Sequence, residues 1–421
     1  MKARPTNAGH GLAAPGRNPA SAGRGAGTHD LRLFLVAGEH SGDALGAKLM
    51  AAINARSKGR VHYLGVGGIQ MEQEGLDSQF PLSDVAVMGP LSILPRLPRI
   101  VRRVHRAVDA AVAAEPDAVV IIDAPEFTHP IAKRIRSRSP SVPIIDYVSP
   151  SVWAWRPGRA HKMRRYLDHV MALLPFEPAA HDRLGGPACT YVGHPLIERL
   201  SWLRELDPSP LAKRLNLDPD RPTIVVLPGS RSSEVGRLMA PFGGAIHLLR
   251  EGGCAPQVII PTVPQLRALI ESRVKNWRIK PALIEGEEDK FRAFKLAHVA
   301  LAASGTVTLE LALAGTPMVV AYRVDRIAAP FLRSLLNVPT VVLANLVLGE
   351  NAFPELLQEE CEPERLAGEI ELLLKNTPER AHQLAALAKI PQRLAVAHGT
   401  PSDAAAEVVL HYAKLGRQAA G

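Results

Sequence analysis

The sequence predicts an α/β protein built from two Rossmann-like domains that face each other across a cleft. Three observations lead to this fold class. Short apolar runs of strand length alternate with stretches of helical pattern, and this alternation occurs in two separate blocks. A polar, mostly helical stretch at residues 196–222 separates the two blocks. Small residues directly follow some of the apolar runs, as they do where a parallel sheet passes into its crossing helices.

Each block contains several expected strands. The first block has apolar runs at 31–37, 62–66, 118–122, 144–148, 170–174 and 190–192, and the second has them at 223–227, 257–260, 282–284, 299–303 and 318–321. Repeated strand–helix spacing of this kind is typical of a doubly wound parallel sheet, which binds ligands at the carboxyl ends of its strands.

The same pattern divides the chain into parts. We expect a disordered N-terminal extension (1–28), a first domain (29–195), a linker (196–222), a second domain (223–385) and C-terminal helices (386–421) that pack back towards the first domain. The last helix should begin at Pro401, with Thr400 as its cap.

Composition and charge exclude several classes of protein. With 421 residues, of which 47% are hydrophobic and 22% charged, the chain is long enough for two or three globular domains. No apolar run reaches the roughly 18 residues that span a bilayer. The three cysteines are far apart and the 15 histidines are scattered, so we expect no disulfide, no metal and no cofactor. The net charge of +9 favours anionic partners, but the chain has no recognisable nucleic-acid-binding module.

Residues 298–322 (HVALAASGTVTLELALAGTPMVVAY) contain the clearest ligand signal. A strand-length apolar run ends there in three small residues that open the next helix: Ser304, Gly305 and Thr306. Such a junction leaves backbone N–H groups open, and the helix dipole favours an anion beside them. Glu310 lies on the same helical face, one turn later, and can accept hydrogen bonds from ribose hydroxyls. The alternative is that Glu310 merely suits the first turns of a helix.

A second junction of the same kind opens the second domain. The apolar run 223–227 leads into Gly229, Ser230 and Arg231 at a helix start. Arg231 can donate two hydrogen bonds to a pyrophosphate and stays charged as a leaving group departs. The alternative is an ion pair between Arg231 and Glu234 at the helix terminus.

The candidate general base is Asp123, which directly follows the apolar run 118–122. A carboxylate at the edge of a parallel sheet is well placed to take a proton from a substrate hydroxyl. The alternative is that Asp123 caps the next helix. Glu39, Asp43 and Glu126 in neighbouring loops are rival bases, and the sequence does not rank the four carboxylates.

Aromatic and basic residues lie together in YVSPSVWAWRPGRAHKMRR (147–165). Trp153 and Trp155, two of only four tryptophans, stand beside Arg156 and further basic residues. Aromatic rings next to cations suit sugar rings, acyl chains or phosphates. The alternation at 153 and 155 equally suits a half-buried strand or loop with one ring in the core.

Residues 85–108 combine apolar and basic side chains. Apolar residues at helical spacing are Leu97, Ile100, Val101, Val104 and Val108, and arginines mark the other side of the helix: Arg96, Arg99, Arg103 and Arg106. The apolar loop ahead of the helix contains Met88, Leu91 and Ile93. A basic amphipathic helix beside an apolar loop is typical of a peripheral protein on an anionic bilayer. The alternative is a helix that packs its apolar side on the sheet and solvates its arginines.

Eight motifs, standing in family order, resemble those of the lipid-A-disaccharide synthases, a bacterial family of inverting glycosyltransferases with the GT-B architecture. The motifs are AGEHSGD (37–43), VMGPLSILPRLP (87–98), DAPEF (123–127), YVSPSVWAWR (147–156), YVGHPL (191–196), LPGSR (227–231), ASGTVTLE (303–310) and FPELLQ (353–358). They span about residues 31–360, which makes the resemblance specific.

The resemblance implies transfer of 2,3-diacylglucosamine from its UDP donor onto 2,3-diacylglucosamine 1-phosphate. The products are a β-1,6-linked disaccharide 1-phosphate and UDP, and no metal takes part. The resemblance places the base role on Asp123 and phosphate contacts on Arg231. It assigns these residues to the substrate and UDP side: Gly38, Glu39, Ser41, Gly42, Gly229, Ser230, Ser304, Gly305, Thr306, Glu310, Asn345 and Gln358. Thr128 stands where many family members have Asn, and its hydroxyl can still orient the aspartate.

Because both substrates carry acyl chains, the resemblance also favours the membrane interpretation of residues 85–108. Acceptor or membrane contacts are then expected from Met88, Leu91, Ile93, Arg96, Arg99, Trp153, Trp155 and Arg156. The protein would be cytoplasmic, bound peripherally to the inner membrane and without a nucleic-acid partner, and a homodimer with swapped C-terminal helices is compatible with the family. The rival interpretations are a UDP-N-acetylglucosamine 2-epimerase, another GT-B transferase, and a non-catalytic nucleotide- or lipid-binding protein.

Overall fold

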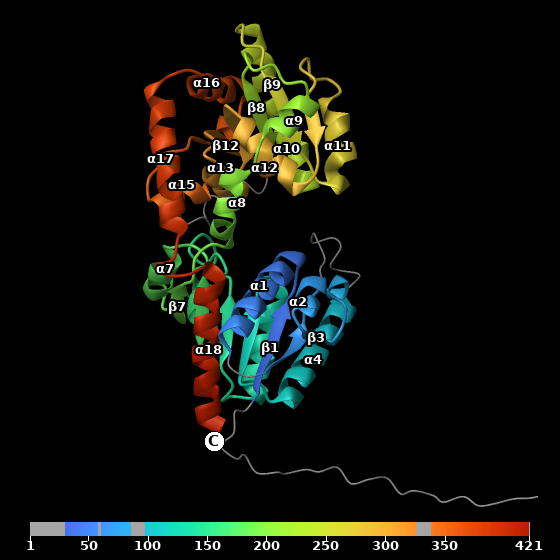
Figure 1. Ribbon diagram of the computed structural model, residues 1–421, viewed down its shortest axis with the longest axis vertical. Coiled ribbons are helices and arrows are strands. Elements are labelled where there is room, and N and C mark those ends of the chain that lie inside the picture. The colour runs from blue at the N-terminus through green and yellow to red at the C-terminus, as the bar shows by residue number, and fades with distance from the viewer. Residues whose placement is uncertain (1–29, 58–59, 86–96, 326–337, 421) are drawn as a thin grey trace, which may run out of the picture.

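The structure is a computed structural model that describes residues 30–57, 60–85, 97–325 and 338–420. The expected N-terminal extension, 1–28, lies outside these residues. Two parallel sheets form the centres of two α/β domains, one above the other in Figure 1. The predicted fold class of two Rossmann-like domains is therefore confirmed, whereas the exact domain boundaries stay a prediction.

The first sheet has the strand order β3-β2-β1-β4-β5-β6-β7, and all neighbours are parallel. Its strands are β1 (Leu31–Ala37), β2 (Val61–Val66), β3 (Leu76–Ser78), β4 (Ala118–Ile122), β5 (Ile144–Tyr147), β6 (His169–Ala172) and β7 (Ala188–Tyr191). The strand order reverses between β1 and β4, so the connections leave this pair in opposite directions. Such a switch point opens a crevice at the carboxyl ends of the two strands, where α/β proteins bind ligands.

The second sheet repeats this arrangement with the order β10-β9-β8-β11-β12-β13, and its switch point lies between β8 and β11. Its strands are β8 (Thr223–Leu227), β9 (Gln257–Pro261), β10 (Ala282–Ile284), β11 (Val299–Ala303), β12 (Met318–Tyr322) and β13 (Glu355–Leu357). The sequence does not predict β3 (LDS) or β13 (ELL), because each has three residues that include a charged one and so produces no apolar run, unlike the equally short β10 (ALI).

Helices cover both faces of each sheet, which explains why the central strands are apolar throughout. The helices of the first domain are α1 (His40–Arg56), α2 (Ile69–Gln73), α4 (Leu97–Ala114), α5 (Pro125–Arg138), α6 (Gly158–Met163) and α7 (Glu177–Arg183). The connecting stretch contains α8 (Leu200–Glu205) and α9 (Ser209–Arg214). The second half of the chain contains α10 (Ser232–Glu251), α11 (Pro264–Val274), α12 (Glu287–Leu296), α13 (Val307–Ala314), α15 (Leu343–Leu348), α16 (Pro363–Leu374), α17 (Pro378–Leu394) and α18 (Pro401–Ala420).

The last helix, α18, returns to the first domain, as predicted (Figure 1). Four small side chains of α18 share a core with β1 and α1: Ala405, Ala406, Val409 and Ala413. The predicted cap is present, because Thr400 Oγ1 accepts a hydrogen bond from the N–H of Asp403 at 3.1 Å. A homodimer that exchanges these helices stays a prediction, since α18 occupies its place on the first domain within this single chain.

Gly416 allows α18 to approach the first sheet closely. A Cβ at this position would lie 2.2 Å from the carbonyl oxygen of Asp117 and 2.9 Å from Pro143. We expect Gly416→Ala to lower the free energy of unfolding by about 1–3 kcal/mol through overpacking, although alanine favours helices. Denaturant unfolding measures the change, with Gly368→Ala as control, because a Cβ on that exposed glycine of α16 meets nothing within 4 Å. Equal effects of the two substitutions would contradict this packing.

Helix α4 matches neither of its two interpretations along its whole length. Val104 is buried, as the alternative of a helix packed on the sheet requires, whereas Leu97 and Val101 are 47% and 44% exposed, as the membrane interpretation requires. Arg103, expected on the solvated side, forms an ion pair with Asp84 instead. The second half of α4 therefore packs on the sheet, while apolar side chains of its first turns face away from the described core.

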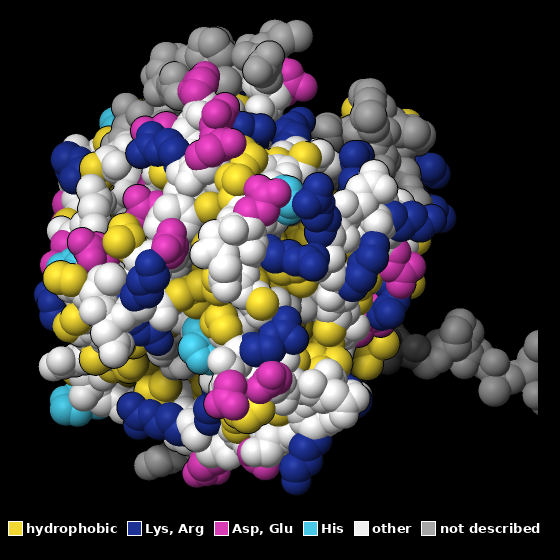
Figure 2. Space-filling view, turned by 90° about the horizontal axis from the view of Figure 1, so that it is seen from above, with side chains coloured by type: hydrophobic (Ala, Val, Ile, Leu, Met, Phe, Trp, Pro, Cys, Tyr) yellow, Lys and Arg dark blue, Asp and Glu magenta, His cyan; other side chains and the backbone are white. Residues whose placement is uncertain are grey.

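The basic excess of the sequence is dispersed on the face of the molecule seen in Figure 2. Lysine and arginine side chains alternate there with aspartate, glutamate and apolar side chains over short distances (Figure 2). The described residues of this face therefore do not form the continuous basic surface typical of nucleic-acid-binding proteins.

Candidate active site

The candidate base Asp123 lies at the switch point of the first sheet, directly after β4. Its Oδ2 accepts a hydrogen bond from Ser41 Oγ at 3.2 Å, at the start of α1. The N-cap residue of α5 is Ala124, and no side chain caps this helix. The alternative that Asp123 serves as a helix cap therefore does not apply, and the carboxylate is held by Ser41 in the first turn of α1.

Backbone strain concentrates around this carboxylate. The φ angles of Asp123, Ala124, Val148 and Arg156 are +53°, +43°, +92° and +54°. Non-glycine residues rarely adopt such values, and β-branched residues such as valine least of all. Strained residues cluster at functional sites, where the surrounding structure must hold a required geometry.

Gly38 lets the turns after β1 and β4 approach each other. A Cβ on Gly38 would lie 2.5 Å from the Cβ of Ala124, so a larger residue would displace the turn that carries Asp123. Thr128, at the position where the resemblance leads one to expect Asn, donates to the backbone carbonyl of Asp123 at 2.8 Å. Thr128 therefore holds the turn, and Ser41 orients the carboxylate.

The structure distinguishes among the rival bases. Asp43 is buried and accepts three hydrogen bonds, of 2.8–3.1 Å, from backbone N–H groups around the start of α2, so its role is structural. The Glu126 side chain is 84% exposed and pairs with Arg159 at 3.1 Å. Glu39 is the remaining rival, and the Asp123 carboxylate acts on it.

Glu39 lies where charges from both domains act together. Burial raises the pKa of the Glu39 carboxyl, and the Asp123 carboxylate raises it further. Arg231 and His40 act in the opposite direction and lower it. Asp123 belongs to the first domain and Arg231 to the second, so charges from both domains contribute to the pKa of Glu39.

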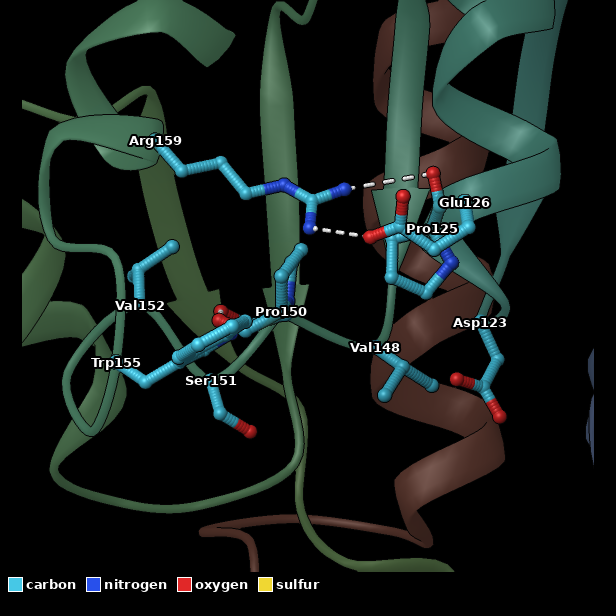
Figure 3. Close-up of a pocket in the computed structure, with 10 residues that line it drawn as sticks. Asp123, Pro125, Glu126, Val148, Pro150, Ser151, Val152, Trp155 and Arg159 are labelled. Carbon is cyan, nitrogen blue, oxygen red and sulfur yellow. Dashed lines mark hydrogen bonds and ion pairs between the residues drawn. The ribbon is translucent and has the colours of Figure 1, made fainter. Parts of the chain in front are cut away.

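A pocket of about 330 Å³ opens beside Asp123 (Figure 3). Ten residues line it: Asp123, Pro125, Glu126, Val148, Ser149, Pro150, Ser151, Val152, Trp155 and Arg159. Apolar walls with a few charged groups are typical of small-molecule sites. Trp155 contributes one wall, and the Arg156 guanidinium lies 4.1 Å from the centre of its ring.

Trp153 lies in the core instead of the pocket. It is 9% exposed, and its Nε1 donates to Glu177 Oε1 at 3.0 Å. Burial raises the pKa of Glu177 to about 7. The alternative of one core ring therefore describes Trp153, and Trp155 is the tryptophan that faces the pocket.

A second pocket, of about 640 Å³, lies at the switch point of the second sheet. It brings together the candidate nucleotide residues of both junctions: Gly229, Ser230, Arg231, Ser304, Gly305, Thr306 and Glu310. Helix α13 begins at this pocket. The N–H groups of Thr308 and Leu309 already donate to the carbonyl oxygens of Gly305 and Thr306, so an anion would meet the earlier N–H groups of the junction, at the positive end of the helix dipole.

Backbone N–H groups of the loop after β8 already have a hydrogen-bond partner, which the sequence does not predict. Glu234 Oε2 accepts hydrogen bonds from the backbone N–H groups of Ser230 (3.0 Å) and Arg231 (3.2 Å), which we expected to be open for phosphate. Arg231 Nη1 also lies 3.1 Å from Glu234 Oε1, so the alternative ion pair is present. An arginine has five N–H donors, so this pair leaves others for a phosphate.

Glu310 has a partner that the sequence does not predict. Lys290 Nζ in α12 lies 3.0 Å and 2.9 Å from the two carboxylate oxygens, and both side chains line the pocket. No motif marks Lys290, because its contact with Glu310 arises only when α12 packs beside α13.

Asn345 and Gln358 lie outside the lining of this pocket. Asn345 is 2% exposed and exchanges two hydrogen bonds with the backbone of Phe353, at 2.9 Å and 3.0 Å. The carbonyl of Gln358 accepts a hydrogen bond from Arg323 Nε at 3.1 Å. Both residues hold loops of the second domain, so their assignment to UDP stays a prediction.

Comparison with known proteins adds an independent line of support. A family model of lipid-A-disaccharide synthetases matches residues 33–408. The chain belongs to this family. A lipid-A-disaccharide synthase from Rhodopseudomonas palustris (strain ATCC BAA-98 / CGA009) is 49% identical over 378 residues, which cover 90% of this chain and 95% of the relative. Lipid-A-disaccharide synthases are hexosyltransferases, and this chain is accordingly a glycosyltransferase.

Solved structures share the GT-B fold of this synthase family. A UDP-GlcNAc 2-epimerase from Neisseria meningitidis, bound to UDP-GlcNAc, has a TM-score of 0.61 and 14% identity, and the match covers 90% of this chain and 99% of that one. A glycosyltransferase from Rickettsia africae ESF-5 has a TM-score of 0.57 and 10% identity, with 92% and 98% covered. Likeness at such identities shows the fold alone. The epimerase interpretation is not favoured, because the synthase family accounts for most of the chain.

The predicted membrane segment of the synthase is described only in part. Met88, Leu91, Ile93 and Arg96 lie outside the described residues. Arg99 is exposed, and its Nε lies 3.9 Å from Asp84. Within the described ranges, every helix is too short or too polar to cross a bilayer, and no group of three or more His, Cys, Asp or Glu side chains could hold a metal ion.

Proposed function

We propose that this protein transfers 2,3-diacylglucosamine from UDP-2,3-diacylglucosamine to the 6-hydroxyl of 2,3-diacylglucosamine 1-phosphate, as a step of lipid A biosynthesis. The observation that supports this most is the family match over residues 33–408, in a chain that places Asp123 and Arg231 in pockets at the switch points of its two sheets. The pocket beside Asp123 would take the acceptor, and the larger pocket around Arg231 would take the UDP-sugar.

Asp123 acts as the base in this proposal. It removes the proton of the 6-hydroxyl while that oxygen attacks the anomeric carbon of the donor from the face opposite UDP. The bond between the new oxygen and the anomeric carbon forms as the bond to UDP breaks, so the configuration inverts, as in single-displacement glycosidases. Ser41 engages Oδ2 of the carboxylate, which leaves Oδ1 for the incoming hydroxyl.

The second pocket stabilises the leaving group. Negative charge develops on the β-phosphate of UDP as the glycosidic bond breaks. Arg231 and the N–H groups at the start of α13 line the same cavity, and donors fixed in advance stabilise such charge at little reorganisation cost. Glu310, held by Lys290, would accept hydrogen bonds from the ribose hydroxyls.

Transfer by the purified protein tests the proposal. UDP should be released from UDP-diacylglucosamine only when the acyl-sugar 1-phosphate is present, and the disaccharide 1-phosphate should accumulate in equal amount. An epimerase would instead convert UDP-N-acetylglucosamine without net UDP release. A non-catalytic binding protein would bind UDP and consume neither substrate, and either of these results would overturn the proposal.

We also propose that residues 85–108 bind the cytoplasmic face of the inner membrane. The exposed Leu97 and Val101 continue an apolar stretch, and Arg99 supplies an exposed positive charge beside them. Acyl chains of both substrates would then stay in the bilayer while the sugars reach the pockets.

Replacing Met88, Leu91 and Ile93 with Ser should release the protein from anionic vesicles, because insertion of their apolar side chains is lost, and should spare UDP binding. Vesicle co-sedimentation and UDP titration measure the two effects. Replacing Leu372, Leu384 and Leu415 with Ser is the control, since these leucines are 39–43% exposed and lie on α16, α17 and α18, outside the proposed membrane segment. Unchanged vesicle binding of the first variant would show that the assignment is wrong.

A further inference from the structure

The pocket beside Asp123 holds a cation that the proposed mechanism does not use. We propose that Arg159 binds the phosphate of the acceptor and so makes the enzyme prefer a sugar 1-phosphate over the same sugar without phosphate. This inference rests on the proposed function, and it adds a residue that selects the acceptor.

Arg159, on α6, extends across the pocket toward Pro125 and Glu126 (Figure 3). Its Nη1 donates to Glu126 Oε1 at 3.1 Å, and its Nη2 lies 3.4 Å from the carbonyl oxygen of Pro125. These two partners follow Asp123 by two and three residues in the chain. The guanidinium is therefore tied to the same short segment that presents the candidate base.

The acceptor carries its reacting hydroxyl and its phosphate close together, as the pocket carries Asp123 and Arg159. The 6-hydroxymethyl group and the 1-phosphate are carried by the two ring carbons on either side of the ring oxygen. A sugar that directs its 6-hydroxyl to Asp123 therefore holds its phosphate only a few bonds away. Val148, Pro150 and Trp155 also line the pocket and provide apolar surface against which a sugar ring can pack.

The volume and charge of the pocket limit what can bind. A cavity of about 330 Å³ is near the lower end of the range for ligand pockets, so it suits a sugar headgroup, and acyl chains must leave through its opening. Among the ten described lining residues, Arg159 is the cation and Asp123 and Glu126 are the carboxylates. Among these lining side chains, Arg159 is therefore the one whose charge favours an anionic ligand.

The present partner of Arg159 is easily exchanged. The Glu126 side chain is 84% exposed, whereas that of Arg159 is 23% exposed. An ion pair with a solvent-exposed carboxylate contributes little free energy. A phosphate carries more negative charge and can accept two parallel hydrogen bonds from one guanidinium. Glu126 therefore competes with the acceptor phosphate for Arg159, so removal of Glu126 should lower KM for the phosphorylated acceptor.

Removal of the two partners should have opposite effects. Arg159→Gln should raise KM for the acceptor 1-phosphate about 10- to 100-fold, the loss expected for hydrogen bonds to a charged group, with little change for the dephosphorylated acceptor. Arg159→Lys should fall between these values, because lysine keeps the charge but not the two-point geometry. Glu126→Gln should lower KM for the phosphorylated acceptor, because it removes the carboxylate that competes with the phosphate for Arg159.

The experiment measures KM and kcat for both acceptors at saturating donor, together with the melting temperature of each variant. Arg138→Gln and Asp109→Asn are the matched controls, because they break an exposed ion pair of the same type at the other end of α5. If the Arg159–Glu126 pair were only structural, Arg159→Gln and Glu126→Gln would change both acceptors equally and in the same direction. That result, or an unchanged preference in Arg159→Gln, would overturn the inference. Failure of the wild-type enzyme to use either acceptor would instead overturn the proposed function.

Discussion

Asp123→Asn should lower kcat about 10²- to 10⁴-fold, the usual contribution of a positioned general base, and leave the affinity for UDP unchanged. The asparagine keeps the size of the side chain and can still accept the hydrogen bond of Ser41, but it cannot take the proton of the acceptor hydroxyl. Steady-state transfer rates and UDP titration separate the two effects. Asp109→Asn, an exposed position on α4, serves as the control.

Glu39→Gln tests the remaining rival. If Asp123 is the base, Glu39→Gln should reduce the rate less than Asp123→Asn does. In Asp123→Asn the pKa of Glu39 should also fall, because the Asp123 carboxylate is one of the two causes that raise it. A near-normal rate in Asp123→Asn, with a large loss in Glu39→Gln, would move the base role to Glu39.

Arg231→Gln should lower kcat/KM for the donor about 10²- to 10³-fold, the effect of removing one fixed donor from a developing negative charge. The variant also leaves Glu234, which is 7% exposed, without its cationic partner. Arg231→Lys should recover part of the rate because it restores the positive charge. Initial rates over a range of donor concentrations measure the loss.

Arg237→Gln is the matched control for this prediction. Arg237 lies on the same helix, α10, and contacts Asp325 at 3.9 Å, but it does not line the pocket. It should behave like the wild type. If kcat/KM for the donor were the same in Arg231→Gln as in Arg237→Gln, other groups than Arg231 would stabilise the leaving group.

Much of the fold could be predicted because buried parallel strands are apolar on both faces. The strands β1, β4, β8, β10 and β11 occupy the expected residues. Edge strands β3 and β13 could not be predicted, since each has three residues that include a charged one, whereas the edge strand β10 is apolar throughout. The faces of α4 were predicted from the periodicity of the helix alone. The ion pair between Arg103 and Asp84 could not be predicted in this way, because Asp84 precedes the helix in the chain.

The candidate site was predictable where a residue follows a buried strand, because the end of such a strand lies at the ligand-binding edge of the sheet. Asp123 and Arg231 are of this kind, and the structure places them at the two switch points. The sequence does not predict side chains whose role depends on contacts between distant segments, because no local pattern marks them. Lys290 beside Glu310 and Arg159 beside Glu126 are examples.

The sequence by itself determined the two-domain α/β architecture, the order of its motifs and the strand ends that carry the candidate site, because these depend on local apolar patterning and turn chemistry. Only the tertiary structure decided which chemically similar residues serve the site. Trp153 is buried and Trp155 is exposed. Asp43 accepts hydrogen bonds from the start of α2, whereas Asp123 lines a pocket. Glu234 accepts a hydrogen bond from an N–H group that we expected to bind phosphate. The reason is physical: burial, hydrogen-bond partners and charge neighbours are properties of segments brought together by the strand order, and no local pattern records them.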